Sequence, residues 1–327
     1  MYNAPSPPPP PIAAQKRTTA VLSLVAPCYN EQEALPLFYK EICDAAAELK
    51  QFDVSVEFIF IDDGSTDETS AIIQALGEKD DRIRYLVFSR NFGKEAAMLA
   101  GLQTAKGDFV AMLDADLQHP PDLLPTMFQA VKSGEYDCAA AVRERTGDSK
   151  PRSFFSRAFY RAINRLSDIE LIDGAGDFRL MSRQYADAIL SLSERSRFSK
   201  GIFQWIGFRT KWLHYENRRR VAGDTKWSFW QLFLYSLDGV VAFSSKPLAI
   251  ASVLGFALFT LSICAIAFVA VRKLMFGDPV QGWASTVCII LFCSGVQLLA
   301  TGIIGEYLAR IYNETKRRPH FVIRKRK

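Results

Sequence analysis

The sequence is poor in the side chains that form disulfides or bind soft metal ions. It has six cysteines and three histidines in 327 residues, with no CxxC pair and no cysteine at metal-ligand spacing from a histidine. A disulfide framework and a cysteine–histidine metal site are therefore disfavoured. We expect the larger part of the chain to work in a reducing compartment.

The sequence also lacks a strong excess of charge. The formal net charge is only +5, and the basic residues gather beside two apolar runs near the C-terminus. Cations clustered in this way suit an anionic membrane surface and phosphate ligands. The charge pattern therefore predicts no nucleic-acid partner.

Charged residues are absent from two long segments, Pro247 to Val271 and Pro279 to Gly305. A helix of about 25 residues rises roughly 37 Å, which exceeds the roughly 30 Å of a bilayer's hydrocarbon core. We predict a two-helix transmembrane hairpin over residues 246–310, with the lipid bilayer as its partner.

Basic residues flank this predicted hairpin. Residues 311–327 form a strongly basic tail, and Arg218–Arg220 and Lys246 precede the first apolar run. The positive-inside rule then predicts that the large domain and the tail are both cytoplasmic. Arg272 and Lys273 on the far side oppose this orientation but are outnumbered.

The N-terminus lacks the hydrophobic core of a secretory signal. Residues 1–19 contain six prolines, five of them consecutive from Pro7 to Pro11, and show no apolar periodicity. We interpret them as a disordered or polyproline II leader, so the segment that follows is expected to stay in the cytoplasm.

Two further segments are rich in aromatic residues. Residues 152–167 alternate arginine with apolar residues at helical spacing, and residues 226–243 have a similar aromatic character. Each could be a surface helix packed on the domain or an interfacial helix whose apolar face enters the lipid headgroups. The neighbouring apolar runs favour the interfacial interpretation, and we predict a juxtamembrane amphipathic helix over 227–245.

Strand and helix patterns alternate over residues 20–226, which we interpret as one catalytic domain. Apolar runs near 20–30, 54–65, 83–89 and 108–116 are separated by segments with helical spacing. This alternation predicts an α/β fold with a mostly parallel sheet covered on both faces. Ligands of such sheets bind beyond the carboxyl ends of the strands. The polar motifs PCYNE, DDGS, SRNFGK and DADLQ all follow strands and are expected to meet there.

The motif DADLQ offers oxygen ligands at the end of an apolar strand. A turn capped by aspartate is the plain alternative. However, Asp114, Asp116 and Gln118 stand at the same parity, so their oxygens can point one way. Mg²⁺ and Mn²⁺ prefer oxygen ligands and commonly share them with substrate phosphates. We therefore predict a divalent metal site that neutralises a nucleoside-diphosphate leaving group.

Taken in order, APCYNEQEAL, IDDGSTDET, SRNFGKEAAMLAGL, DADLQHPPDLLP and GDTKWS, followed by two apolar runs, resemble the family 2 glycosyltransferases. Within that family the chain is similar to the polyisoprenyl-phosphate glycosyltransferases, which include dolichyl-phosphate mannose synthase and bactoprenol glucosyltransferases. The resemblance covers roughly residues 20–320 and implies a GT-A catalytic domain.

The resemblance also implies roles for individual residues. Asp177 matches an acidic position near the acceptor, although a capping aspartate in the glycine-containing loop 172–183 is the alternative. Arg220 and Lys226 match positions near the lipid phosphate, with snorkelling beside the membrane as the alternative. Asp116 and Asp177 are the expected catalytic residues, and Asp114, Asp116 and Gln118 the expected metal ligands. The expected nucleotide-sugar site comprises Pro27, Tyr29, Glu31, Asp63, Lys94, Asp114 and Arg143.

The activity implied is inverting transfer of one hexose from a nucleotide sugar to a polyisoprenyl phosphate, with glucose, UDP-glucose and undecaprenyl phosphate favoured. The QxxRW motif of processive synthases is absent, which disfavours polymerisation. GDP-mannose or a UDP-aminosugar as donor, and a non-catalytic lipid-sugar carrier, remain alternatives. The enzyme is expected to be a homo-oligomeric integral protein of the inner membrane, with Mg²⁺ or Mn²⁺ as cofactor.

Overall fold

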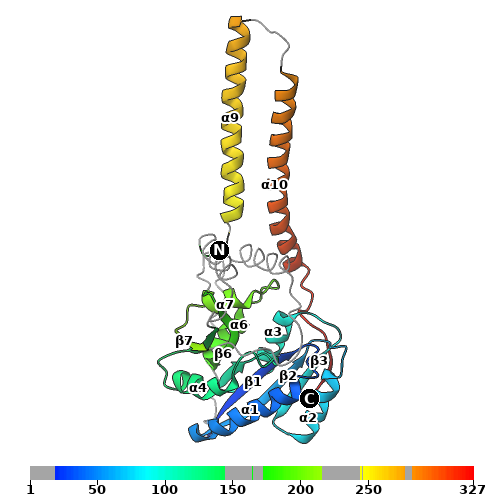
Figure 1. Cartoon of the computed structure of the whole chain (residues 1–327), viewed down its shortest axis with the longest axis vertical. Coiled ribbons are helices and arrows are strands. Elements are labelled where there is room, and N and C mark those ends of the chain that lie inside the picture. The colour runs from blue at the N-terminus through cyan, green and yellow to red at the C-terminus, as the bar shows by residue number, and fades with distance from the viewer. Residues whose placement is uncertain (1–18, 144–163, 165–171, 216–243, 245, 277–281) are drawn as a thin grey trace, which may run out of the picture.

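A computed structural model of the protein describes residues 19–143, 164, 172–215, 244, 246–276 and 282–327. An α/β body carries two long helices that extend from it side by side (Figure 1). The expected leader, the aromatic segments at 152–167 and 226–243, and the predicted lipid-phosphate ligands Arg220 and Lys226 fall outside the described residues, apart from Thr19 and Asn164.

The body is built on an eight-stranded sheet in the order β7-β5-β6-β4-β1-β2-β3-β8. Four adjacent strands, β4, β1, β2 and β3, are parallel, as expected from their predominantly apolar runs. The remaining strands make the sheet mixed, because β6 runs antiparallel to both β4 and β5, and β8 runs antiparallel to β3. The strands are β1 (Ala20–Cys28), β2 (Val54–Asp62), β3 (Ile83–Phe88), β4 (Phe109–Met112), β5 (Cys138–Arg143), β6 (Ala175–Ser182), β7 (Thr210–Tyr215) and β8 (Ile323–Arg326).

Strand β6 corrects one prediction. Asp177 was expected in a glycine-containing loop, but it lies in β6, which is inserted between β4 and β5. The glycines stand at the start of this strand, where Gly174 has a φ of 81°. Further along, Phe178 and Leu180 are fully buried on one face and Met181 on the other, so the segment is a core strand.

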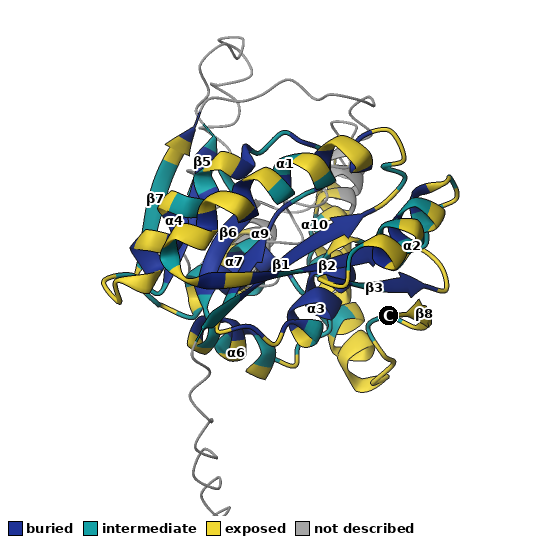
Figure 2. Ribbon diagram, turned by 90° about the horizontal axis from the view of Figure 1, so that it is seen from below, coloured by how far each residue is buried: buried dark blue, intermediate teal, exposed yellow. Residues whose placement is uncertain are grey.

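Helices cover both faces of the sheet, and each covered face encloses its own apolar cluster (Figure 2). On one face lie α1 (Leu35–Leu49), α2 (Thr69–Lys79) and α4 (Leu124–Lys132), with the short η1 (Lys50–Phe52) and η2 (Pro121–Leu123). On the other lie α3 (Lys94–Thr104), α6 (Arg183–Ser191) and α7 (Ser199–Trp205). Adjacent residues of β1 show the arrangement, because Leu24 belongs to the first cluster and Val25 to the second. The predicted α/β architecture is confirmed.

The two long helices are α9 (Lys246–Phe276) and α10 (Trp283–Thr315), which contact each other. Many of their large apolar side chains are exposed, Phe256 and Leu298 by 73% and 74%. In the part of the chain that the structure describes, one segment, Phe292–Thr315, has the length and hydropathy of a membrane span. A shorter apolar helix covers Leu248–Leu258.

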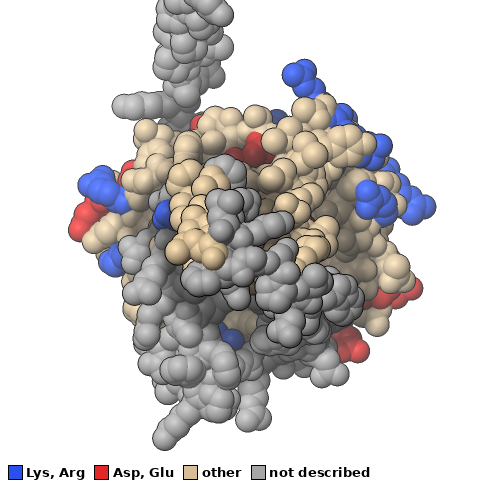
Figure 3. Space-filling model, turned by 90° about the horizontal axis from the view of Figure 1, so that it is seen from above, with Lys and Arg blue, Asp and Glu red and all other residues tan. Residues whose placement is uncertain are grey.

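The C-terminal tail, residues 316–327, returns to the body. We predicted a basic tail over residues 311–327; in the structure α10 continues to Thr315, and β8 then pairs antiparallel with β3 at the edge of the sheet. The prediction missed this strand because all four residues of β8 are exposed and show no apolar alternation. Viewed from the side of the long helices, basic side chains gather along one edge of the molecule (Figure 3).

Candidate active site

The central feature of the site is a lysine between two aspartates. Lys94 Nζ lies 2.8 Å from Asp114 Oδ2 and 2.5 Å from Asp177 Oδ2. Sheet geometry brings the carboxylates together: Met112 of β4 is opposite Arg179 of β6, and the same antiparallel register continued by two residues puts Asp114 opposite Asp177. Three residues predicted separately for the site therefore form one cluster.

Lys94 and Asp177 of this cluster stay charged at neutral pH. Burial lowers the pKa of the Lys94 amine, but the carboxylates of Asp114 and Asp177 outweigh it, so the pKa is raised. Burial raises the pKa of Asp177, but Lys94 and then Lys200 outweigh this effect and hold that pKa well below its usual range. The site therefore holds two carboxylates and a bridging ammonium, with Lys200 of α7 nearby.

Asp63 supports the loop that delivers Lys94. Its side chain is 3% exposed, and its carboxylate accepts hydrogen bonds from the backbone N–H groups of Phe92 (2.7 Å) and Gly93 (3.0 Å). Burial raises the pKa of Asp63, and these two N–H groups oppose the rise. Gly93, with a φ of 97°, then starts α3 at Lys94. The nucleotide contact expected for Asp63 stays a prediction.

Gly64 lets the chain after β2 approach the same loop closely. Its φ is 66°, and a Cβ atom built there would lie 2.3 Å from the backbone carbonyl carbon of Arg90. The chain after β2 and the chain after β3 are thus in direct backbone contact, which only glycine at this position permits.

The PCYNE segment follows β1 at the same edge of the sheet. Pro27 is buried, Tyr29 is 39% exposed, and the Glu31 N–H donates to Thr69 Oγ1 at 2.8 Å. Asn30, with a φ of 55°, accepts a hydrogen bond from the Thr66 N–H at 2.9 Å. The loops after β1 and β2 are therefore tied together beside Asp63, as parallel strand ends predict.

The DADLQ segment forms a tight turn. Asp116 Oδ1 accepts the Gln118 N–H at 3.1 Å, and Leu117 between them has a φ of 61°. The turn considered from the sequence is therefore present. The hydrogen bond of this turn uses one carboxylate oxygen of Asp116. The side chains of Asp116 and Gln118 are both half-buried.

Two site residues, His119 and Tyr215, were not predicted. His119 Nδ1 lies 2.6 Å from the Tyr215 hydroxyl, and His119 Nε2 lies 3.7 Å from Asp114 Oδ2. Burial lowers the pKa of His119 and raises the pKa of Tyr215 to about 12. A neutral imidazole that accepts a hydrogen bond from the Tyr215 hydroxyl at Nδ1 carries its own proton at Nε2, which faces Asp114. In the sequence, only the position of His119 directly after DADLQ indicates that it could belong to the site.

Comparison with known proteins assigns the family. Residues 23–190 match the family model Glycosyl transferase family 2. The chain belongs to this family. The Bacillus subtilis protein CsbB is 46% identical over 304 residues, covering 93% of this chain and 91% of that protein. A bactoprenol glucosyl transferase of Shigella phage SfX is 40% identical over 306 residues, covering 94% and 99%. This protein is therefore a family 2 glycosyltransferase.

Among solved structures, the family 2 chain is similar to glucosyl-3-phosphoglycerate synthase from Mycobacterium tuberculosis in complex with Mn²⁺, UDP-glucose and phosphoglyceric acid. Identity is 18% and the TM-score 0.45, covering 68% of this chain and 78% of that one. The mannosyltransferase PcManGT from Pyrobaculum calidifontis, in complex with GDP-Man and Mn²⁺, is 15% identical with a TM-score of 0.45, covering 89% and 87%.

The side chains of this candidate site could bind a hard metal ion whose remaining ligands are water or substrate oxygens. Within the described residues, no three histidine, cysteine, aspartate or glutamate side chains are grouped so that they could hold a metal ion. Asp114, Asp116 and Gln118 offer oxygen atoms only, which fits Mg²⁺ or Mn²⁺ completing its shell with water and phosphate oxygens. Arg143, at the end of β5, stands opposite Tyr215 in the register and donates its backbone N–H to Gly174 O at 3.0 Å.

Proposed function

We propose that the protein transfers one glucose from UDP-glucose to a polyisoprenyl phosphate, with undecaprenyl phosphate the favoured acceptor, and with inversion at the anomeric carbon. The observation that carries the proposal is the 40% identity to a bactoprenol glucosyl transferase over 94% of this chain and 99% of that one. A likeness of that length includes the C-terminal helices as well as the catalytic domain.

The donor side of the reaction follows from the strand-end residues. We assign the base and ribose to Pro27, Tyr29, Glu31 and Asp63, and the diphosphate to Lys94 and Arg143. Asp114, Asp116 and Gln118 would hold Mg²⁺ or Mn²⁺, which when bound neutralises charge on the leaving diphosphate. Lys94 would add a second positive charge there, because its ammonium already lies 2.8 Å from the Asp114 carboxylate.

The acceptor side needs little proton transfer. A lipid phosphate oxygen is already ionised near neutral pH, so it can attack the anomeric carbon while the bond to the nucleoside diphosphate breaks. Asp177 would orient Lys94 and the acceptor rather than act as a strict base, in keeping with its lowered pKa. Arg220 and Lys226 are assigned to the lipid phosphate.

We further propose that α9 and α10 form a membrane hairpin, with the catalytic domain and the C-terminal tail on the cytoplasmic side of the inner membrane. The pairing of β8 with β3 supports this arrangement, because it needs the tail and the body on one side and hence an even number of crossings. Homo-oligomerisation stays a prediction.

The test of the function is transfer of labelled sugar by the purified full-length protein. With undecaprenyl phosphate and Mg²⁺, label from UDP-glucose is expected to enter the organic phase, and label from GDP-mannose or a UDP-aminosugar to enter it less. Preferred transfer from another donor would correct the sugar. No transfer from any donor, with Mn²⁺ also tried, would favour the carrier alternative.

The topology has a separate test. A cysteine introduced at Asp278, between the helices, is expected to react with a membrane-impermeant maleimide in intact cells. A cysteine at Lys325, in β8, is expected to react only after the membrane is opened. The native cysteines are replaced by serine in both chains as the matched background. The reverse labelling pattern would overturn a cytoplasmic donor site.

A further inference from the structure

The C-terminal tail contacts the loop that carries Lys94. The Phe321 ring stacks on Phe88, the last residue of β3, with centroids 4.9 Å apart and planes 9° apart. Phe88 in turn meets Phe92 edge to face at 5.8 Å and 88°. One step further, Ser89 donates its N–H to Val322 O at 2.9 Å. The tail therefore contacts the loop formed by residues 89–93 directly at Ser89, and it reaches Phe92 through the ring of Phe88.

Opposite the tail, the inner side of this loop is held by Asp63, through the N–H groups of Phe92 and Gly93. Lys94 follows immediately and reaches both site carboxylates. Only Gly93 separates Phe92 from Lys94, so we expect a shift of Phe92 to be passed on to the start of α3. The position of the ammonium therefore depends on contacts on both sides of the loop.

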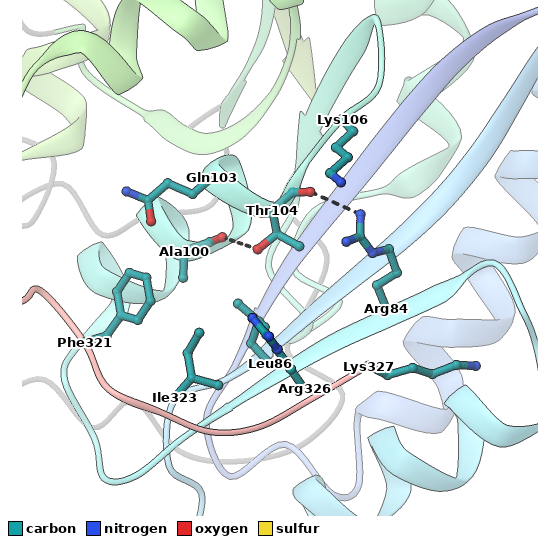
Figure 4. Close-up of a pocket in the computed structure, with 10 residues that line it drawn as sticks. All are labelled: Arg84, Leu86, Ala100, Gln103, Thr104, Lys106, Phe321, Ile323, Arg326 and Lys327. Atoms are coloured by element: carbon teal, nitrogen blue, oxygen red, sulfur yellow. Dashed lines mark hydrogen bonds between the residues drawn. The ribbon is translucent and has the colours of Figure 1, made fainter.

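Behind Phe321 the tail is not packed tightly. A cavity of about 490 Å³ lies between the tail, β3 and α3, and Phe321 forms part of its wall with Ala100 and Gln103 (Figure 4). Phe321 nevertheless packs against the apolar cluster to which Ala97 and Ala100 of α3 contribute. The tail is also attached by its backbone pairing with β3 and by the hydrogen bond from Lys325 Nζ to Gln74 Oε1. The cavity also leaves room for a larger side chain at position 321.

We propose that Phe321 is a positioning residue for Lys94: by stacking on Phe88 it keeps Phe92 and Gly93 on Asp63 and so aligns the Lys94 ammonium with Asp114 and Asp177. The C-terminal tail, which follows α10, would thus help to set the geometry of the donor site. The catalytic part of this inference rests on the proposed role of Lys94 at the donor diphosphate. Its structural part does not.

The structural part is tested by hydrogen exchange in the full-length protein, held in detergent micelles. In Phe321→Ala the Phe92 and Gly93 amides are expected to exchange about tenfold faster, as loss of one aromatic contact implies. Val322→Ala is the matched control, because its side chain is 48% exposed and its backbone carbonyl still accepts the Ser89 N–H. Unchanged exchange in Phe321→Ala would overturn the proposal whatever the substrates are.

The catalytic part is tested by transfer kinetics on the same variants. Phe321→Ala should raise the apparent KM for the donor about tenfold, since small misalignments of a reacting group are costly, and leave the KM for the lipid phosphate unchanged. In Phe321→Tyr the apparent KM for the donor should stay at the wild-type value, because this variant keeps the stacked ring. A fall in turnover with both KM values unchanged would indicate lost folded protein and would refute the positioning role. If the wild type transfers no sugar, the proposed function fails while the exchange result still decides the structural part.

Discussion

Asp116→Asn is expected to abolish sugar transfer while the protein stays folded and membrane-bound. Asp116 supplies one of the two carboxylates at the end of β4, and its Oδ1 already accepts the Gln118 N–H. Asparagine can keep that hydrogen bond through its amide oxygen, so the turn should survive. What is lost is the negative charge that a divalent cation needs. Removal of one such preorganised electrostatic contact commonly costs about a hundredfold to a thousandfold in turnover.

The measurement is the initial rate of label transfer at saturating substrates, with thermal unfolding as the check on folding. Asp122→Asn is the matched control, since Asp122 is an exposed carboxylate at the next helix and should tolerate the change. In the wild type, EDTA should stop the reaction, and Mg²⁺ or Mn²⁺ should restart it. Full activity in chelator, or an active Asp116→Asn, would mean that DADLQ is only the turn it also forms.

Lys94→Met is expected to lower turnover by about a hundredfold and to change how stability depends on pH. The first effect follows from losing the only cation within 3 Å of both Asp114 and Asp177 in the described structure. Methionine keeps the length and the helix preference of the side chain, so the start of α3 should persist.

The pH effect follows from Asp177. In the wild type its pKa is lowered, so its contribution to stability is present above the unfolded value of about 3.9 and is lost only as the pH falls further. Once Lys94 is removed, we expect burial, the largest effect on this group, to outweigh the remaining cations Lys200 and Arg179 and to raise the Asp177 pKa. The ionised form then destabilises the fold at neutral pH, and the melting temperature of Lys94→Met should rise as the pH falls from 7 to 5.

Melting curves at three pH values test this difference. The wild type and Lys106→Met, which removes an exposed lysine just beyond α3, should not gain stability over that range from Asp177. A Lys94→Met protein whose melting temperature follows the wild type at every pH would show that Lys94 and Asp177 are not coupled in solution.

The parallel core of the fold could be predicted because its strands are predominantly apolar, with isolated polar residues such as Glu57 in β2 and Arg84 in β3. Strand β6 could not, because its first residues are an alanine, a glycine and an aspartate, and Arg179 within it is only 2% exposed. A buried arginine contradicts the pattern expected of a core strand. Its side chain is accommodated by a hydrogen bond to Gly176 O and by the Phe203 ring 3.3 Å away, neither of which the local sequence indicates.

Several residues of the candidate site were predicted from the sequence, but the contacts between them were not. Lys94, Asp114 and Asp177 were each assigned, but the ion pairs between them span 20 and 83 residues of sequence. Spacing along the chain does not reveal such pairs, because they depend on the order of strands in the sheet. His119 and Tyr215 were missed for the same reason, since Tyr215 ends a strand 96 residues further along the chain.

The pairing of β8 with β3 also sets an order of assembly during synthesis. Strand β8 follows both long helices in the chain, so β3 can be paired on its outer side only after α9 and α10 have left the ribosome. Until then the nascent body presents β3 as an open edge, the kind of surface to which other chains add strands. Under the proposed topology the chain crosses the membrane twice before β8 reaches β3, so the edge of the sheet would be closed only after the hairpin is complete.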